Sequence, residues 1–105
     1  MLKKSRRLVT KQFNEVMAKG RVSRTPLFVV RTLGGFKDTR LAAVMPQKIA
    51  KKAVIRNMAK RTIYQAVESI FDKIRNGTHA LIIAKTDISS ADIMEVSAEL
   101  LEVLR

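Results

Sequence analysis

The sequence predicts an α+β fold, a single sheet with helices packed on it. Apolar residues recur every three or four positions over residues 51–75, a pattern typical of a helix with one buried face. Residues 27–33 and 79–84 are short runs rich in apolar and β-branched residues, a composition that predicts β-strands. The chain has 105 residues, of which 47% are hydrophobic, so we expect one domain over residues 1–105.

The first predicted element is a short amphipathic helix. Thr10 can cap it, Lys19 is its last residue and Gly20 stops it. Three apolar side chains fall at i, i+3 and i+4 and share one stripe: Phe13, Val16 and Met17. A short extended piece over residues 21–24 can follow.

Two strands are predicted next. Pro26 opens a strand over residues 27–33, and Gly34 with Gly35 ends it as a turn. Residues 39–45 are its expected partner strand. Successive side chains of a strand point to opposite faces. One face would then carry Leu27, Val29, Arg31 and Leu33, and the other Phe28, Val30 and Thr32.

The second half of the chain is expected to hold a long helix, a buried strand and a last helix. The long helix covers residues 51–75 and ends at the turn that contains Gly77. Residues 79–84 are expected as a buried strand. Ser89 can cap the last helix, and Asp92 three positions later completes a capping box. One sheet covered by helices accounts for this order of elements.

The charge of the chain is large and unevenly distributed. Lys and Arg number 21 and Asp and Glu 9, which gives a net charge of +12. Residues 1–61 carry 17 basic and 2 acidic side chains, whereas residues 62–105 carry 4 basic and 7 acidic ones. Such segregation suits a polyanionic partner, of which nucleic acid comes first and an acidic membrane surface second.

One cationic cluster lies at the start of the long helix. On a helix, Arg56 lies one turn before Lys60, and Asn57 one turn before Arg61. The positive end of the helix dipole adds to their mutual repulsion, and no acidic residue occurs between Thr39 and Val67. Phosphates would relieve this repulsion through Arg, Lys and amide contacts. The competing interpretation is a plain solvated helix face.

A second constellation combines apolar and basic groups. Phe13 and Met17 of the first helix are expected to face the strand that carries Phe28 and Arg31. Aromatic and apolar groups beside cations can stack single-stranded bases. The competing interpretation is that Phe13 and Phe28 belong to the ordinary core.

Enzyme constellations are absent from the sequence. The chain has no cysteine and one histidine, His79, so no zinc site, disulfide framework or thiol nucleophile is predicted. No spacing suggests a catalytic triad, so we expect no catalytic and no metal-ligating residues in this chain. No apolar run approaches the roughly 20 residues that a membrane span needs.

The stretch from Lys52 to Arg61 contains a recognisable signature. It has a Lys-Ala-Val lead-in, then Arg-Asn, then Lys-Arg three and four residues after the Asn. This closely resembles the signature of the bacterial ribonuclease P protein family. Other segments agree in order and spacing over nearly the whole chain: Leu2 to Lys4 with Arg7 and Leu8, Phe13 with Lys19 and Gly20, Arg40 with Leu41, Lys48, and Ile82 to Lys85.

The resemblance implies the protein subunit of a ribonucleoprotein. In this family, an RNA subunit with bound magnesium removes the 5′ leader of precursor tRNA, and the protein binds both that RNA and the leader. The family fold has the order α-β-β-β-α-β-α with a left-handed crossover through the long helix. General rules alone favour a right-handed crossover.

The resemblance also assigns residues. By position, the contacts with the RNA subunit fall on Lys48, Lys51, Lys52, Arg56, Asn57, Lys60 and Arg61. The leader cleft falls on Phe13, Met17, Arg31, Arg56 and Asn57. The family usually has a second Arg where this chain has Met58, and further aromatics where it has Met17 and Arg31. Stacking in the cleft is therefore expected to be weaker and charge contact stronger.

Two other functions compete with this one. A structural RNA-binding protein of ribosomal-protein type would share the charge and the α+β build but would not promote cleavage of precursor tRNA. A peripheral membrane binder would need a strongly apolar, basic amphipathic helix, and the first helix is too short and too weakly apolar. We expect a cytoplasmic protein whose partners are the RNA subunit and precursor tRNA, with magnesium bound by the RNA subunit and no cofactor bound by a recognisable motif of this chain. We expect no membrane and no obligate protein partner.

Overall fold

The computed structural model describes residues 2–105 and has the predicted order of elements. Short 3₁₀ turns at Lys4–Arg6 and Phe71–Lys73 flank two of the regular elements. The helices and strands in chain order are α1 (Thr10–Lys19), β1 (Arg21–Arg24), β2 (Phe28–Leu33), β3 (Arg40–Val44), α2 (Ala53–Ile70), β4 (His79–Ala84) and α3 (Ile93–Leu104). The α+β class and the order α-β-β-β-α-β-α are confirmed.

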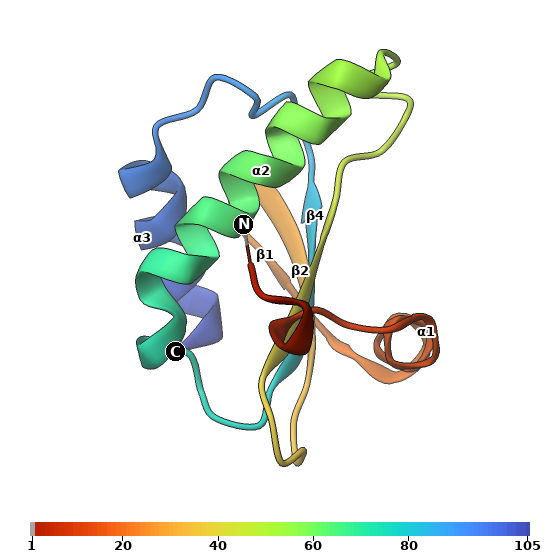
Figure 1. Cartoon of the computed structure of the whole chain (residues 1–105), viewed down its shortest axis with the longest axis vertical. Helices are drawn as coiled ribbons and strands as arrows, with labels where there is room; N and C mark the ends of the chain where they lie inside the picture. The colour runs from red at the N-terminus through yellow and green to blue at the C-terminus, as the bar shows by residue number, and fades with distance from the viewer. Residues whose placement is uncertain (1) are drawn as a thin grey trace.

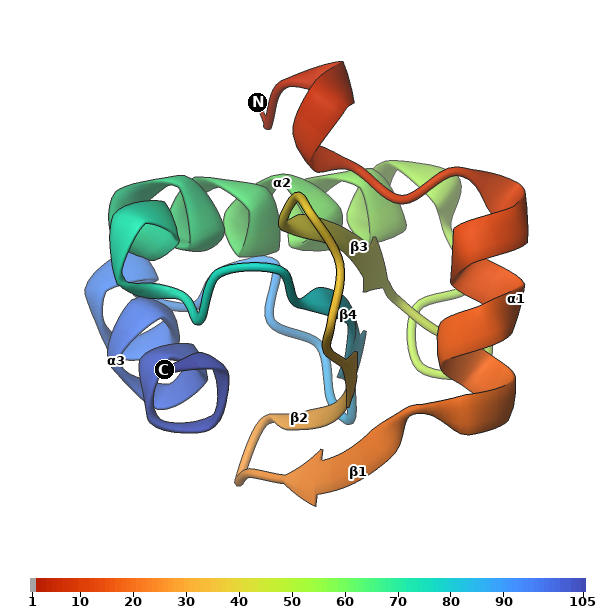
Figure 2. The same ribbon diagram turned by 90° about the horizontal axis from the view of Figure 1, so that it is seen from below.

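The four strands form one mixed sheet in the order β1-β2-β4-β3. β2 pairs antiparallel with β1 and with β4, whereas β3 pairs parallel with β4. The parallel pair is connected through α2. Viewed from the α2 side with β3 pointing up, β4 lies to the left of β3, so the crossover is left-handed (Figures 1 and 2). This is the handedness that the family resemblance implied.

Helices cover both faces of the sheet. α2 and α3 lie on one face and α1 lies on the other (Figure 2). Alternation along each strand sends one set of side chains into the main core beneath α2 and α3. The fully buried members of that core include Phe28, Val30, Leu41, Ile63, Ile82 and Leu100. On the α1 face, Val16 and Leu81 are also fully buried but lie outside this core.

Two predicted caps were wrong. Thr10 is the first residue of α1 rather than its cap. Val9 holds the cap position, and its N–H donates to Oε1 of Gln12 at 2.9 Å. α3 starts after Asp92, whose carboxylate accepts from the N–H of Met94 at 2.9 Å, so Ser89 is not the cap. At α3 the Asp92 carboxylate satisfies one free N–H of the first turn, whereas at α1 Gln12 accepts the N–H of the cap residue itself.

α2 is shorter than predicted at both ends. It begins at Ala53 because Arg56 bonds to the carbonyls of Ala50 and Lys51 and holds that segment in a turn. It ends at Ile70, where the chain tightens into a 3₁₀ turn that brings Ile74 into the core. The strands, in contrast, begin and end within one residue of their predicted bounds.

Candidate RNA interface

The cationic cluster predicted at the start of α2 is assembled in the structure. The buried stripe of α2 includes Ala59, Ile63, Ala66 and Val67. Asn57 and Arg61 lie away from this stripe and are exposed, and Arg56 and Lys60 flank it and are half-buried. Lys48, Lys51 and Lys52 are exposed in the segment that leads into the helix.

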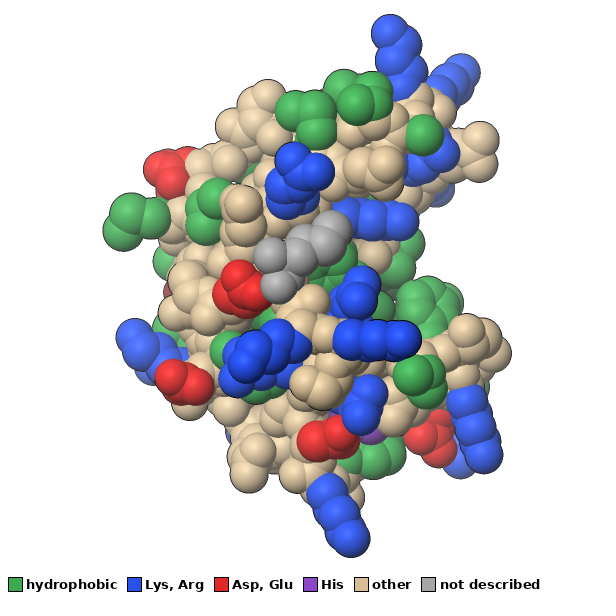
Figure 3. Space-filling model, viewed as in Figure 1, with side chains coloured by type: hydrophobic (Ala, Val, Ile, Leu, Met, Phe, Trp, Pro, Cys, Tyr) green, Lys and Arg blue, Asp and Glu red, His purple; other side chains and the backbone are tan. Residues whose placement is uncertain are grey.

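No carboxylate neutralises the cluster within residues 2–105. The ion pairs of this part of the chain join Asp38 to Arg40 and to His79. Figure 3 faces α2 and shows Lys and Arg side chains, without Asp or Glu, at the N-terminal end of the helix. The same view shows the surface hollowed between this end of α2 and α1. Cations that have no carboxylate partner among residues 2–105 and that border a hollow are open to a polyanion.

Arg56 has an internal role as well as an exposed edge. Its Nη1 donates to the carbonyl oxygen of Ala50 at 3.0 Å and to that of Lys51 at 2.7 Å. These bonds fix the guanidinium at the entry of the helix. They use one of its three nitrogens, and the other two have no hydrogen-bond partner in the described part of the chain.

Three of the predicted cleft residues, Phe13, Met17 and Arg31, lie on α1 and on the face of the sheet that α1 covers, away from Arg56 and Asn57 of α2. Arg31 of β2 points to α1, and its Nη1 donates to the carbonyl oxygen of Met17 at 3.1 Å. Met17 is 42% exposed and Phe13, one turn earlier, is half-buried. Val16 between them is fully buried against the sheet. α1 therefore presents one aromatic and one thioether side chain beside a fixed guanidinium.

α1 packs against β2 as predicted, but Phe28 does not belong to this cleft. Its side chain is fully buried in the main core with α2 and α3. The reason is strand alternation, which puts Phe28 and Arg31 on opposite faces of β2. Its alternative interpretation, an ordinary core residue, is confirmed.

The structure brings together the members of each group, but it does not join the two groups. Arg56 and Asn57 make no hydrogen bond to Phe13, Met17 or Arg31 within residues 2–105. The hollow between them is open to a ligand that touches both α1 and the start of α2 (Figure 3).

Sequence reasoning missed the role of Tyr64. Its hydroxyl accepts the N–H of Ala43 at 3.2 Å, which satisfies a donor on the free edge of β3. Beside it, a cavity of about 330 Å³ opens at this edge. It is lined by Lys4, Arg7, Leu8, Val9, Ala42 and Tyr64. The signal was the spacing of Tyr64 one turn after Lys60, at the border of the buried stripe.

The N-terminal segment is pinned to the same edge. Arg7 forms a parallel bridge with Leu41, and the N–H of Leu8 donates to the carbonyl oxygen of Leu41 at 3.1 Å. Arg40 donates from Nη1 to the carbonyl oxygen of Arg7 at 3.2 Å. Cations of the first residues are thereby held along β3, close to α2.

His79 has a structural environment. Its ring is buried and stacks on Phe36 with the ring centroids 3.7 Å apart, and Nε2 lies 3.3 Å from Oδ1 of Asp38. Hydrogen bonds from Arg40 and, to a lesser degree, from His79 lower the pKa of the Asp38 carboxyl. Within residues 2–105, no group of His, Asp and Glu side chains is arranged to hold a metal ion, and no helix is long and apolar enough to span a membrane.

Known proteins resemble this chain over nearly its whole length. The family model of ribonuclease P matches residues 2–105. The ribonuclease P protein component of Geobacillus kaustophilus is 31% identical over 107 residues, which cover 100% of this chain and 88% of the relative. The component from Listeria welshimeri is 33% identical, with 100% and 89% covered.

A solved structure agrees with the fold. The ribonuclease P protein from Thermotoga maritima superimposes with a TM-score of 0.80 at 26% sequence identity, covering 93% of this chain and 94% of that one. A family model that spans almost every residue, relatives above 30% identity and a shared fold agree with one another. The chain therefore belongs to the ribonuclease P protein family.

Proposed function

We infer that this chain is the protein subunit of ribonuclease P and takes part in tRNA processing as an RNA-binding component of that endoribonuclease. Family membership over residues 2–105 supports the subunit role. The observation that carries the RNA-binding role is the cluster of Arg56, Lys60 and Arg61, which no carboxylate of the described chain neutralises.

We propose that the start of α2 binds phosphates of the RNA subunit. Arg61 and Lys60 supply charge, Asn57 supplies an amide, and the free edge of Arg56 can take a phosphate oxygen pair. The flanking lysines 48, 51 and 52 are exposed and widen the positive field. Bond cleavage and the magnesium that it requires are assigned to the RNA subunit.

We propose further that the 5′ leader of precursor tRNA lies in the hollow between α1 and the start of α2. Phe13 and Met17 offer apolar contact for bases, and Arg31 offers charge. The bond from Arg31 to the backbone of Met17 fixes that charge beside the apolar pair. The leader would be held extended, so the protein would position substrate and leave the chemistry to its RNA partner. We propose that the protein acts in the cytoplasm.

The test of the function is reconstitution. The chain is added to a bacterial ribonuclease P RNA at low magnesium, and removal of the leader from precursor tRNA is measured. We expect faster cleavage with the protein than without it. A structural RNA-binding protein of ribosomal type would bind RNA but leave the cleavage rate unchanged. The family match disfavours that alternative.

The test of the interface is a salt titration with two variants. Filter binding to the RNA subunit should weaken about 10³-fold from low to physiological ionic strength, because several phosphate contacts release counterions. Arg61→Ala should reduce affinity and flatten the slope of log K against log salt by about 1. Lys73→Ala, outside the cluster, should do neither. Equal effects of the two changes would show that the start of α2 is not special.

A further inference from the structure

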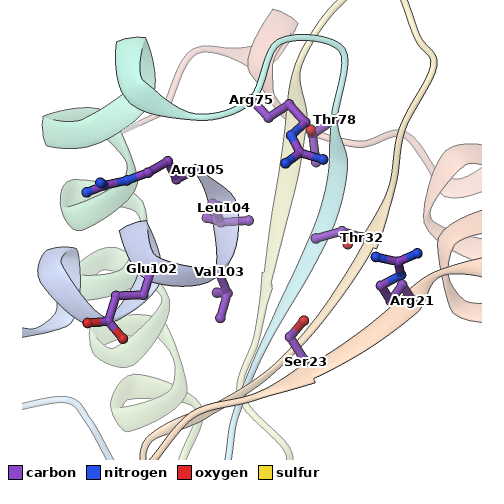
Figure 4. Close-up of a pocket in the computed structure, with 9 residues that line it drawn as sticks. All are labelled: Arg21, Ser23, Thr32, Arg75, Thr78, Glu102, Val103, Leu104 and Arg105. Atoms are coloured by element: carbon purple, nitrogen blue, oxygen red, sulfur yellow. The ribbon is translucent and has the colours of Figure 1, made fainter.

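A second basic site lies at the opposite end of the molecule from the start of α2. Two adjoining cavities of about 300 and 370 Å³ share the side chains of Arg21, Thr32 and Arg75. One cavity adds Ser23, Thr78 and the end of α3, and the other adds Lys19. Figure 4 shows the first cavity, with Arg21 and Arg75 on either side of Thr32.

The fold builds this site from distant segments. Arg21 pairs with Thr32 across β1 and β2, so the two side chains are neighbours on the face opposite α1. Arg75 follows α2, and its N–H donates to the carbonyl oxygen of Leu104 at 2.8 Å, which clips this loop to the end of α3. Both guanidinium groups are thus placed by backbone pairing rather than by each other.

The turn from α1 into β1 is equally constrained. A Cβ on Gly20 would lie 2.5 Å from the carbonyl oxygen of Val16, so only glycine allows this close approach. The N–H of Gly20 donates to that same oxygen at 2.8 Å. The tight turn sets Lys19 and Arg21 at adjoining cavities.

The cations at this site have no carboxylate partner in the part of the chain that the structure describes. Within residues 2–105, no carboxylate forms an ion pair with Lys19, Arg21 or Arg75. Glu102 lines one cavity, but its carboxylate extends away from Thr32 and from both guanidinium groups (Figure 4). Paired guanidinium groups beside hydroxyls match the oxygens of a phosphate.

We propose that Arg21 and Arg75, with the hydroxyl of Thr32, form a second binding site for backbone phosphate of RNA. This rests on the proposed function, since the phosphate would belong to the same RNA partner. Residues 56 to 70 of α2 alone span about 21 Å at 1.5 Å per residue. The protein therefore contacts two separate RNA segments, one at each end of α2.

The first test compares two double variants in filter binding to a bacterial ribonuclease P RNA over a range of salt concentrations. Arg21→Gln/Arg75→Gln removes two cations of the site. Arg24→Gln/Lys73→Gln removes the same charge from exposed positions outside it, since alternation puts Arg24 on the other face of β1. We expect the first to lower the slope of log K against log salt by about 2 and the second to leave it close to the wild-type slope. Equal slopes for the two double variants would overturn the proposal.

The second test locates the RNA. The chain has no cysteine, so Asn76→Cys and Val54→Cys each give one attachment point for an iron chelate that generates hydroxyl radicals. Both positions are exposed, one beside Arg75 and one at the start of α2. We expect the two to cleave different segments of the RNA. Cleavage from Val54→Cys alone would refute the second site and leave the proposed function intact. Cleavage from neither would refute both.

Discussion

The substitution Arg56→Ala should cost folding stability as well as RNA affinity. Nη1 of Arg56 donates to the carbonyl oxygens of Ala50 and Lys51, which lie in the turn before α2. The N–H of Ala50 itself bonds to the carbonyl oxygen of Pro46 at 3.2 Å, and Ala50 is 6% exposed. Removing the guanidinium therefore frees two carbonyls at a folded turn that leads into the longest helix.

The magnitude follows from the number and exposure of these bonds. A hydrogen bond from a charged donor contributes about 1.5–3 kcal/mol when well shielded. Here one nitrogen serves both acceptors and the side chain is half-buried, so water can replace part of the loss. We expect a loss of about 1–2 kcal/mol in the free energy of unfolding. In a domain of this size that corresponds to a fall of about 5–10 °C in Tm.

Urea denaturation followed by circular dichroism measures this loss, with the midpoint as the readout and an unchanged m-value as the check on two-state unfolding. The matched control is Arg61→Ala, one helical turn and one residue further on. Arg61 is exposed and makes no hydrogen bond through its side chain within residues 2–105, so its change should stay within about 0.5 kcal/mol. If both variants unfold at the wild-type midpoint, the two bonds of Arg56 do not stabilise the turn, and its affinity loss is due to RNA contact alone.

Three further changes test the structure around the sheet. Asp38→Asn should destabilise the protein at neutral pH but not at strongly acidic pH. Folding lowers the pKa of the Asp38 carboxyl, chiefly through the hydrogen bond from Arg40. The stability that this carboxylate contributes is therefore present above the ordinary pKa of 3.8 and is lost as the pH falls through the folded pKa. Urea midpoints of the wild type and the variant at pH 6 and pH 2.5 measure this difference. Gly77→Ala should cost more than about 1 kcal/mol in the same assay, because φ is +79° and the new Cβ would lie 2.3 Å from the carbonyl oxygen of Phe36; an unchanged midpoint would contradict this. Tyr64→Phe should lower the free energy of unfolding by about 1 kcal/mol and speed hydrogen exchange at the N–H of Ala43, which bonds to the Tyr64 hydroxyl. Unaltered exchange would show that water replaces the hydroxyl equally well.

Periodicity predicted most of the fold. The alternation of β2 placed Phe28 and Val30 on one face and Arg31 on the other, and the three-four spacing of α2 placed its buried stripe. These patterns succeed because burial is decided residue by residue along a single element. The caps failed because Thr10 and Ser89 are good caps by type, but residue type alone does not decide at which residue the helical hydrogen bonds begin.

Strand order was beyond the sequence. β4 lies between β2 and β3, so the prediction that residues 39–45 pair with the strand over residues 27–33 was wrong. A period-2 pattern states which face a strand buries but not which neighbour it has. The left-handed crossover likewise came from family resemblance, against the general preference.

The distribution of charge along the chain was predicted correctly, but the sequence did not show which cations the fold brings close together. The basic excess of residues 1–61 suggested one basic half, and Arg75 lies outside it. The fold returns Arg75 to the sheet end and sets it beside Arg21, which is 54 positions earlier in the chain. A count of charges by segment cannot detect a pair that only tertiary contacts create.

The fold contributes a fixed separation between the cationic cluster at the start of α2 and the proposed second site at Arg21 and Arg75. An unfolded chain with the same net charge of +12 would also bind RNA, since that attraction needs no geometry. A folded α2, fixed by its buried stripe to the sheet and to α3, holds Arg61 and Arg75 at a set separation. The two proposed phosphate contacts, held at a fixed separation, would select an RNA by its shape, and this selectivity should disappear on unfolding while salt-dependent binding remains. Competition by an unrelated structured RNA, measured with native protein and with protein in urea, distinguishes these two contributions: equal competition in both states would show that the fold contributes no selectivity.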